Sequence, residues 1–291
     1  MIKNWYIYLI CILVSGCFFA CQDVDLSDQS IFDTSEKERN EFDRWLKENY
    51  LDPYNIDFKY RMEHIESDYT HNLVPGEFWL SVKLAKIVKH CWLEAYDEVG
   101  GVAFTRTCAP KVIHVIGSAS WDKGTITLGT AEGGLKVTLY MGNWLDLTNP
   151  DRMNEYYFKV MHHEFAHILH QTKTYPTEEF DKISAGNYTP SGWQNRKLQE
   201  VAPLGFVTPY AGSQPREDIA EVTACYLTYP VEQWNQVMEL AGETGGAIIS
   251  QKLDMVKKYM KSSWGVDLDL LRKVIARRTN EISELDLDHI Y

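Results

Sequence analysis

Apolar and polar residues follow a helical period early in the chain and then change to short alternating runs. Apolar side chains recur at helical spacing over 36–49, behind a capping-box pattern at 35–38, and again over 76–99. Stretches rich in β-branched residues follow, and the turn residues AEGG (131–134) separate the last two of them. The expected strands are 54–62, 111–117, 124–130 and 135–141. We therefore expect a small mixed β-sheet with a hairpin.

From about residue 151 the pattern is mainly helical. The Asn-Pro-Asp sequence at 149–151 is typical of a helix start, and 153–171 then continues without glycine or proline. Residues 172–214 are rich in turn residues, and a further helix is expected after them, with Pro215 near its start. More helices are expected at 231–241, 247–262 and 267–279.

The order of these elements predicts one folded domain behind an export segment. Residues 1–20 hold a nearly continuous apolar run that is too short for a resident transmembrane helix, so we interpret them as a bacterial signal peptide. Residues 21–34 are polar and are expected to form a tether. The remainder, 35–291, is expected to be a single α+β domain with a sheet-containing part (35–150) and a mainly helical part (151–291).

Two cysteines at the end of the apolar run fit a lipoprotein processing site. Val-Ser-Gly-Cys17 matches the pattern in which the cysteine receives the lipid. Phe-Phe-Ala-Cys21 matches less well at its large aromatic residue, but cleavage there would leave a polar segment beside the lipid. Cys17 and Cys21 are both candidates for lipidation, and a secretory signal without lipidation is a third alternative. A lipid on either one would tether the folded domain to a membrane outside the cytoplasm.

Charge and cysteine content narrow the function classes. The 291 residues carry a net charge of −12 without a basic stripe, which argues against a nucleic-acid partner. Outside the signal segment the cysteines are Cys91, Cys108 and Cys225, and the absence of a CxxC pair excludes a cysteine zinc knuckle. A Cys91–Cys108 disulfide and buried free thiols are both compatible with this count.

The most specific chemistry lies in the long helical stretch, in His163-Glu-Phe-Ala-His167. Positions i and i+4 share one face of a helix, so His163 and His167 can bind one zinc ion together. Glu164 lies about 100° round the helix, where it can act on a water at the metal. His162 has no such partner, because residue 166 is alanine. The alternative interpretation is a partly buried helix with hydrogen-bonded histidines.

A catalytic zinc ion usually takes a third protein ligand. His170 shares the face, but a straight helix separates residues 163 and 170 by about 10.5 Å along its axis, too far for one ion. The helix expected after Pro215 begins with Glu217-Asp218-Ile-Ala-Glu221, in which the two glutamates share a face. One can bind zinc while the other accepts a hydrogen bond from a ligand imidazole. The alternatives are Asp218, Glu221 or His170 as the ligand, or a solvated acidic helix start.

These motifs resemble the zincin metallopeptidases whose third ligand is a glutamate. HEFAH followed by a separate ExxAE helix is similar to the gluzincin pattern, and Tyr210 precedes Glu217 by the spacing of lethal-factor-type zinc peptidases. The resemblance implies a zincin-like fold with Zn²⁺ as cofactor, held by His163, His167 and Glu217. It also implies that Tyr210 stabilises the tetrahedral intermediate and that Glu221 supports a ligand.

The chain also resembles the substrate import-associated zinc metallohydrolase lipoproteins of Bacteroidetes. The resemblance covers SDQSIFDT (27–34), HHEFAHILHQ (162–171) and EDIAE (217–221). It implies an outer-membrane lipoprotein, facing the periplasm or the cell surface, with SusC/SusD-like import components as partners. The expected function is zinc-dependent hydrolysis of peptides or glycoproteins with Glu164 as general base. The alternatives are a catalytically silent surface-binding subunit of an import complex and a hydrolase of a non-peptide amide.

An extended peptide bound by a zincin pairs with an edge strand above the active-site helix. Either 135–141 or 125–130 could supply that strand. The first is preferred because it is nearer to the helix in sequence.

Overall fold

The computed structural model describes residues 38–63, 71–122, 125–132 and 134–291. The expected signal peptide, both lipidation candidates and the expected tether lie outside the described residues. Within the described part, residues 40–291 belong to one compact unit. None of the helices described there is long and apolar enough to cross a bilayer.

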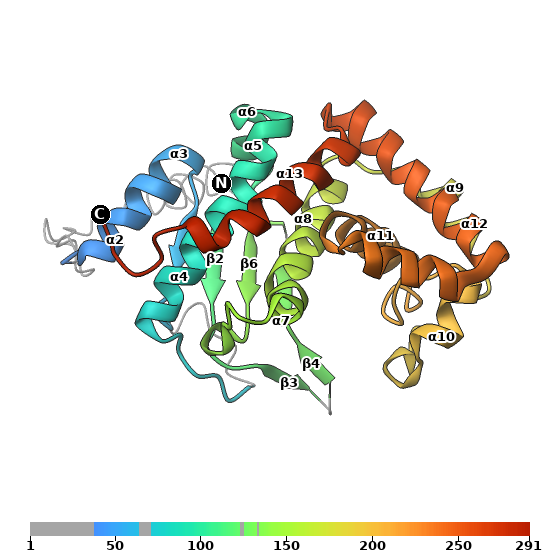
Figure 1. Ribbon diagram of the computed structural model, residues 1–291, viewed down its shortest axis with the longest axis horizontal. Coiled ribbons are helices and arrows are strands. Elements are labelled where there is room, and N and C mark those ends of the chain that lie inside the picture. Colours follow the sequence, from blue (N-terminus) through green and yellow to red (C-terminus); the bar gives the residue numbers. More distant parts are fainter. Residues whose placement is uncertain (1–37, 64–70, 123–124, 133) are drawn as a thin grey trace, which may run out of the picture. The chain divides into compact units, whose positions relative to one another are not determined.

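Helices form most of this unit (Figure 1). The α-helices are α2 (Glu41–Leu46), α3 (Asp52–Tyr54), α4 (Phe78–Val88), α5 (Glu94–Gly100), α6 (Val102–Cys108), α7 (Pro150–Met153), α8 (Lys159–Thr172), α9 (Thr177–Ile183), α10 (Leu198–Val201), α11 (Pro215–Thr228), α12 (Val231–Trp264) and α13 (Leu268–Asn280). Segments of π-helix are η1 (Lys47–Leu51), η3 (Lys89–Leu93) and η5 (Asn154–Phe158). Short 3-10 turns are η4 (Gly142–Trp144), η6 (Trp193–Asn195), η7 (Ala202–Leu204) and η8 (Glu281–Glu284).

A four-stranded mixed sheet packs against α8. Its strands, in spatial order, are β1 (Asp57–Lys59), β2 (Val112–Val115), β6 (Lys136–Leu139) and β5 (Gly129–Glu132). The first three are parallel, and β5 runs antiparallel to β6 at the edge. A separate antiparallel hairpin joins β3 (Ser120–Asp122) to β4 (Thr125–Thr127). The predicted α+β class with a small mixed sheet is confirmed.

The hairpin expected around residues 131–134 is present, but the preference for 135–141 as the substrate-binding strand is wrong. β6 lies between β2 and β5, so its backbone groups are paired on both sides. An extended peptide can add only to a strand with an open edge. β5 lies at the edge of the sheet next to β6, and it begins within the alternative stretch 125–130.

The predicted helices are present but differ in extent, and α6, α9 and α10 were not predicted; α9 and α10 lie in the stretch 172–214 that was expected to be loop. The first described helix begins after Asn40, which forms a capping box with Asp43, whereas most of the predicted capping box at 35–38 lies outside the described residues. The helices expected at 231–241 and 247–262 form one element, α12. Gly242 marks a kink within it, at φ 64° and ψ −165°, a conformation open to glycine because it has no β-carbon.

Helix α8 is buried along most of its length because it has partners on several sides. Phe165 packs edge-on against Trp92 and Tyr96, with ring centroids 5.5 and 4.8 Å away. On the sheet side, Gly129 of β5 lies so close to Val160 that a β-carbon at residue 129 would collide with it. The missing side chain therefore lets the edge strand lie directly against the helix. α11 packs against a further side of α8 (Figure 1).

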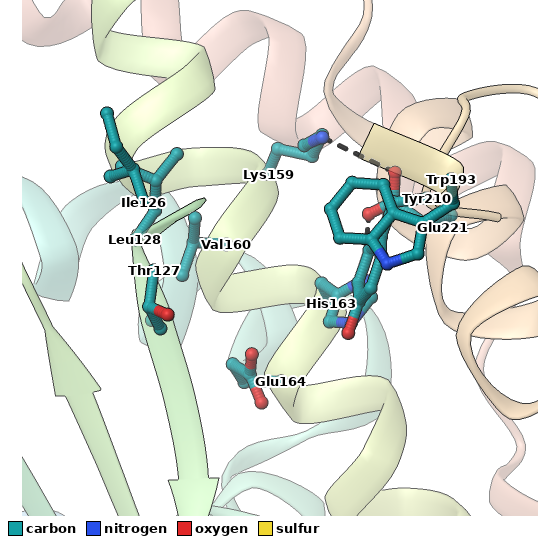
Figure 2. A pocket seen from close by; sticks show the side chains of 11 residues that line it. Ile126, Thr127, Leu128, Lys159, Val160, His163, Glu164, Trp193, Tyr210 and Glu221 are labelled. Atoms are coloured by element: carbon teal, nitrogen blue, oxygen red, sulfur yellow. Dashed lines mark hydrogen bonds and ion pairs between the residues drawn. The ribbon is translucent and has the colours of Figure 1, made fainter. Parts of the chain in front are cut away.

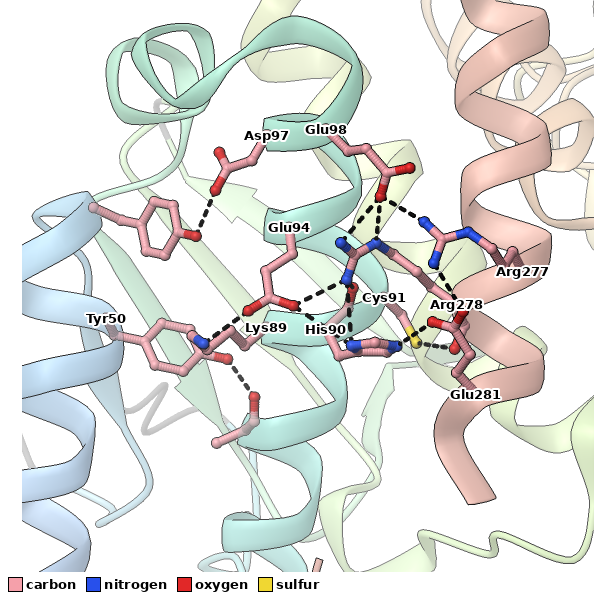
Figure 3. A network of polar contacts seen from close by, with 12 residues as sticks. Tyr50, Lys89, His90, Cys91, Glu94, Asp97, Glu98, Arg277, Arg278 and Glu281 are labelled. Atoms are coloured by element: carbon pink, nitrogen blue, oxygen red, sulfur yellow. Dashed lines mark hydrogen bonds and ion pairs between the residues drawn. The ribbon is translucent and has the colours of Figure 1, made fainter. Parts of the chain in front are cut away.

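A polar network joins α13 to α5 (Figure 3). Arg278 contacts Glu94 at 2.9 Å and Glu98 at 3.1 Å, and Arg277 also contacts Glu98. The Arg278 pairs are partly buried and the Arg277 pair is more exposed, and together they fix how α13 lies on α5. Because α5 carries Tyr96, the network indirectly supports α8.

The cysteines of the described residues are buried free thiols. Of the two alternatives that the sequence allowed, the structure thus shows no Cys91–Cys108 disulfide. Burial raises the pKa of Cys91 and of Cys225 to about 12, so both thiols are protonated at neutral pH.

Candidate metal centre

Three side chains from α8 and α11 converge on one point. Nε2 of His163 and Nε2 of His167 are 3.1 Å apart, and Oε2 of Glu217 lies 3.1 and 3.0 Å from them. The i, i+4 spacing places both imidazoles on one face of α8, and α11 packs there and brings the carboxylate. Two atoms that bind one zinc ion tetrahedrally at about 2.0–2.1 Å are about 3.3 Å apart, which is close to the observed separations.

Glu221, one turn after Glu217 on α11, orients His163. Its Oε1 lies 2.8 Å from Nδ1 of His163, and its Oε2 accepts a hydrogen bond from Thr208 at 2.6 Å. A carboxylate in this place favours the tautomer with its proton on Nδ1, which directs the Nε2 lone pair to the point of convergence. Burial alone would lower the pKa of His163, but contacts with Glu217 and Glu221 raise it to about 10. The surroundings thus favour positive charge.

The converging atoms are a set that needs a cation. In this tautomer Nε2 of His163 and the carboxylate of Glu217 are both acceptors, so without a metal ion the imidazole must take up a second proton before it can donate to Glu217. Burial opposes ionisation of Glu217, but hydrogen bonds with His163 and His167 hold its pKa well below the usual range. Buried acceptors about 3 Å apart are stable only with protons or a metal ion between them. Two imidazoles and one carboxylate suit zinc.

A cavity of about 280 Å³ opens beside these atoms (Figure 2). Glu164 lines the cavity but does not belong to the converging group, as expected from its place on the helix. One wall is formed by Ile126, Leu128 and Val160, and the opposite wall by Trp193 and Tyr210. A water or a substrate in this cavity can therefore meet the carboxylate of Glu164 beside the ligand group.

Tyr210 lies over the imidazole of His163. The two ring centroids are 5.7 Å apart at an interplanar angle of 28°, and the Trp193 ring packs on Tyr210 at 4.6 Å. Burial and the nearby carboxylate of Glu217 raise the pKa of Tyr210 above its ordinary value. The hydroxyl therefore stays protonated and can donate a hydrogen bond. The sequence did not single out Trp193, because a tryptophan in a loop-rich stretch is equally typical of a core or rim residue.

Comparison with known proteins identifies the family of this chain. The family described as "Putative zinc-binding metallo-peptidase" matches residues 35–269. The chain belongs to this family. It is also similar to a solved structure described as a "putative zinc-binding metallo-peptidase from Bacteroides caccae ATCC 43185", with 86% sequence identity and a TM-score of 0.78. That similarity covers 90% of this chain and 100% of the other. No curated protein matches.

The zinc cofactor predicted from the sequence is confirmed by membership of this zinc-binding metallo-peptidase family. Among the described residues, His163, His167 and Glu217 form the group that could hold the ion.

Asp218, named from sequence as an alternative ligand, contacts another part of the protein. Its Oδ2 lies 2.6 Å from Nζ of Lys252 and accepts a hydrogen bond from Tyr188 at 2.9 Å. Lys252, on α12, also donates to the carbonyl of Gly205 at 2.7 Å. Both charged side chains are 0% exposed. Burial raises the pKa of Asp218 to about 6 although Lys252 opposes the shift.

The remaining histidines of the motif stretch lie in the core. The ring of His170 packs against Tyr175 and Tyr259, with centroids 4.8 and 5.4 Å away, and burial lowers its pKa to about 3. Nδ1 of His162 lies 3.0 Å from the hydroxyl of Tyr96, and burial lowers the pKa of His162 to about 3 as well. Neither side chain joins the converging group.

Proposed function

We propose that this metallo-peptidase family member is an active zinc-dependent peptidase in which Glu164 is the general base. The observation that carries the proposal is the place of Glu164: it lines the cavity beside His163, His167 and Glu217 without belonging to their cluster. A carboxylate that is adjacent to a metal group but does not bind the metal can accept and donate protons there.

The roles of the other side chains follow from their contacts. A zinc ion held by His163, His167 and Glu217 would supply a Lewis acid that polarises a substrate carbonyl and makes a nearby water more acidic. Glu164 takes a proton from that water and passes it to the leaving amine. Tyr210 donates a hydrogen bond where negative charge develops on the carbonyl oxygen. Glu221 holds the imidazole of His163 in the orientation that binding requires.

A peptide is the substrate class that the sheet favours. β5 is an edge strand, and Gly129 brings it directly against α8. Gly129 also lines the cavity, next to Ile126, Thr127 and Leu128. An extended peptide that adds to β5 would therefore run past the cavity and the ligand group, with its backbone held by strand pairing.

We also propose that the chain is a lipoprotein of the outer membrane that works beside SusC/SusD-like import components. The support is the N-terminal sequence, in which Cys17 or Cys21 would carry the lipid. Fractionation of cells that express Cys17→Ala and Cys21→Ala variants tests the anchor. One variant should leave the membrane fraction, and membrane attachment of the double variant would contradict it.

The function is tested with Glu164→Gln, which keeps the size and hydrogen-bonding oxygen of the side chain. The substrate is a mixture of peptides from a digested protein, and its cleavage is followed by mass spectrometry. We expect the rate of cleavage to fall by roughly 10²- to 10⁴-fold in the variant. Zinc content should remain at one ion per chain. Equal cleavage by both proteins would remove Glu164 from the chemistry. An absence of cleavage by the zinc-loaded wild type would favour a catalytically silent binding subunit.

A further inference from the structure

The proposed mechanism leaves one charged residue of the cavity without a role. Lys159 lies on α8 one turn before His163, and its side chain is 23% exposed. Figure 2 shows it between the two walls, at the end of the cavity opposite Glu164. A substrate group that enters past Glu164 and fills the cavity therefore comes close to the ammonium group of Lys159.

The ammonium group of Lys159 has a long contact with a carboxylate of the protein. Its Nζ lies 3.4 Å from Oε2 of Glu221, longer than the roughly 2.7–2.9 Å of close ammonium–carboxylate pairs. Glu221 has closer contacts with Thr208, at 2.6 Å, and His163, at 2.8 Å. Burial would lower the pKa of Lys159, but Glu221 raises it above its ordinary value, so the amine is charged at neutral pH.

The walls of the cavity limit what can reach this cation. Ile126, Leu128 and Val160 form an apolar side, and the ring of Trp193 stands opposite. A group that fits them has an apolar stem and an anionic end, because the stem buries apolar surface and the end meets the ammonium. A basic side chain would bring a second positive charge into the same partly buried space, which is unfavourable.

We infer that this cavity is a specificity pocket in which Lys159 binds a carboxylate of the substrate. The inference rests on the proposed peptidase function and names its substrate class: peptides with a carboxylate on the residue that enters the cavity. That carboxylate can belong to a glutamate or aspartate side chain or to the free C-terminus of a peptide.

The experiment uses internally quenched peptides that differ in one residue, glutamate, glutamine or lysine, placed in turn at each position around the scissile bond. One set has amidated C-termini and a second set has free C-termini. For the zinc-loaded wild type we expect kcat/KM at one position to be about tenfold or more higher with glutamate than with glutamine, and lowest with lysine. Faster cleavage of the set with free C-termini than of the amidated set, with glutamate and glutamine alike, would assign the carboxylate to the chain end.

Variants then locate the preference. Lys159→Met should bring the glutamate-to-glutamine ratio close to one, Lys159→Arg should restore it, and Lys159→Glu should favour lysine. Thr208→Val is the matched control, because it also removes a partner of Glu221 but leaves the charge of the cavity unchanged. It should lower kcat/KM for all peptides alike and keep their ratio.

Two results would separate the inference from the function on which it rests. Peptides that are cleaved with a ratio unchanged in Lys159→Met would overturn the pocket and leave Lys159 as a support for Glu221. For a readout independent of turnover, the same peptides are titrated against zinc-loaded Glu164→Gln while tryptophan fluorescence is followed, with charge-selective binding expected. No cleavage by the wild type and no charge-dependent binding would overturn both proposals.

Discussion

Glu217 and Asp218 are neighbours in sequence, and both are buried carboxylates, yet they lie in opposite kinds of surroundings. Asp218 meets a lysine of the same chain, with Nζ of Lys252 2.6 Å away. Glu217 meets two imidazoles whose nitrogens lie at 3.1 and 3.0 Å. Successive residues of a helix point about 100° apart, so one turn of α11 serves two regions, a closed ion pair and an open ligand group.

The difference teaches how a structural carboxylate is told from a ligand. A buried charge needs a partner, and the folded chain supplies one to Asp218 in Lys252. For Glu217 the nearest partners are groups that favour a cation from outside the chain. The comparison predicts that substitution of Lys252 lowers the stability of the protein, whereas substitution of Glu217 lowers its affinity for zinc.

The largest effect expected is from Lys252→Met. The substitution leaves Asp218 buried without its cation, which should lower the free energy of unfolding by about 3–5 kcal/mol. Urea denaturation of protein treated with a chelator measures this without a contribution from zinc. The control is Lys257→Met on the same helix, because the Lys257–Asp269 pair is partly exposed and should contribute less than about 1 kcal/mol. Equal losses of unfolding free energy in the two variants would contradict a special role for the buried Lys252–Asp218 pair.

Glu217→Gln should show the opposite pattern. Glutamine keeps an oxygen for hydrogen bonding, so we expect the metal-free protein to lose less than about 1.5 kcal/mol of stability. Its zinc affinity should fall by more than the roughly 10- to 100-fold that is typical of changes to groups behind the ligands. Competition against a zinc-binding dye gives the affinity. Unchanged affinity would move the third ligand elsewhere on α11.

Glu221→Gln is expected to have an intermediate effect on zinc affinity, because Glu221 contacts a candidate ligand but does not itself converge on the metal. It supports His163 without converging on the metal, so we expect zinc affinity to fall by roughly 10- to 100-fold. The same dye competition is suitable. A loss as large as that of Glu217→Gln would place Glu221 among the ligands, and no loss would show that His163 does not need it.

The smallest effect concerns His170 and depends on pH. Its pKa is about 3 in the folded protein and about 6.5 in an unfolded chain, so below pH 6.5 the unfolded chain binds the extra proton. Stability should therefore fall as the pH drops from 6.5 towards 3, with about 2 kcal/mol lost at pH 5 from this residue.

His170→Gln removes that part of the loss and should leave one zinc ion per chain. Urea denaturation of the metal-free protein at pH 7 and pH 5 measures the slope for both proteins. Identical slopes would contradict the assignment of His170 to the core, and loss of zinc would return it to the candidate ligands.

The candidate ligand group could be named from the sequence because most of its signal is local. The spacing of His163 and His167 fixes their common face, and the step to Glu164 fixes a different direction. Glu217 needed the resemblance as well, since an acidic helix start alone does not show which carboxylate turns to the metal. The partner of Asp218 lies 34 positions away on α12, and nothing in the sequence around either residue indicates the pair.

The sheet shows where sequence reasoning stops for the fold. Strand positions follow from composition, but the order of strands depends on long-range pairing, so proximity in sequence misled the choice of 135–141. Lys159 was missed for a similar reason. A lysine one turn before a ligand is ordinary in sequence, and its place in the cavity depends on Trp193 and on the strand opposite.

The contact of Gly129 with Val160 has a consequence for protein engineering. The clearance between β5 and α8 depends on the absence of a side chain at this position. A β-carbon at position 129 would collide with Val160, so either that side chain or the strand, with any substrate paired to it, would have to shift. A library that aims to admit bulkier substrates should therefore hold position 129 constant and vary the helix side, where trimming Val160 adds room without moving the strand.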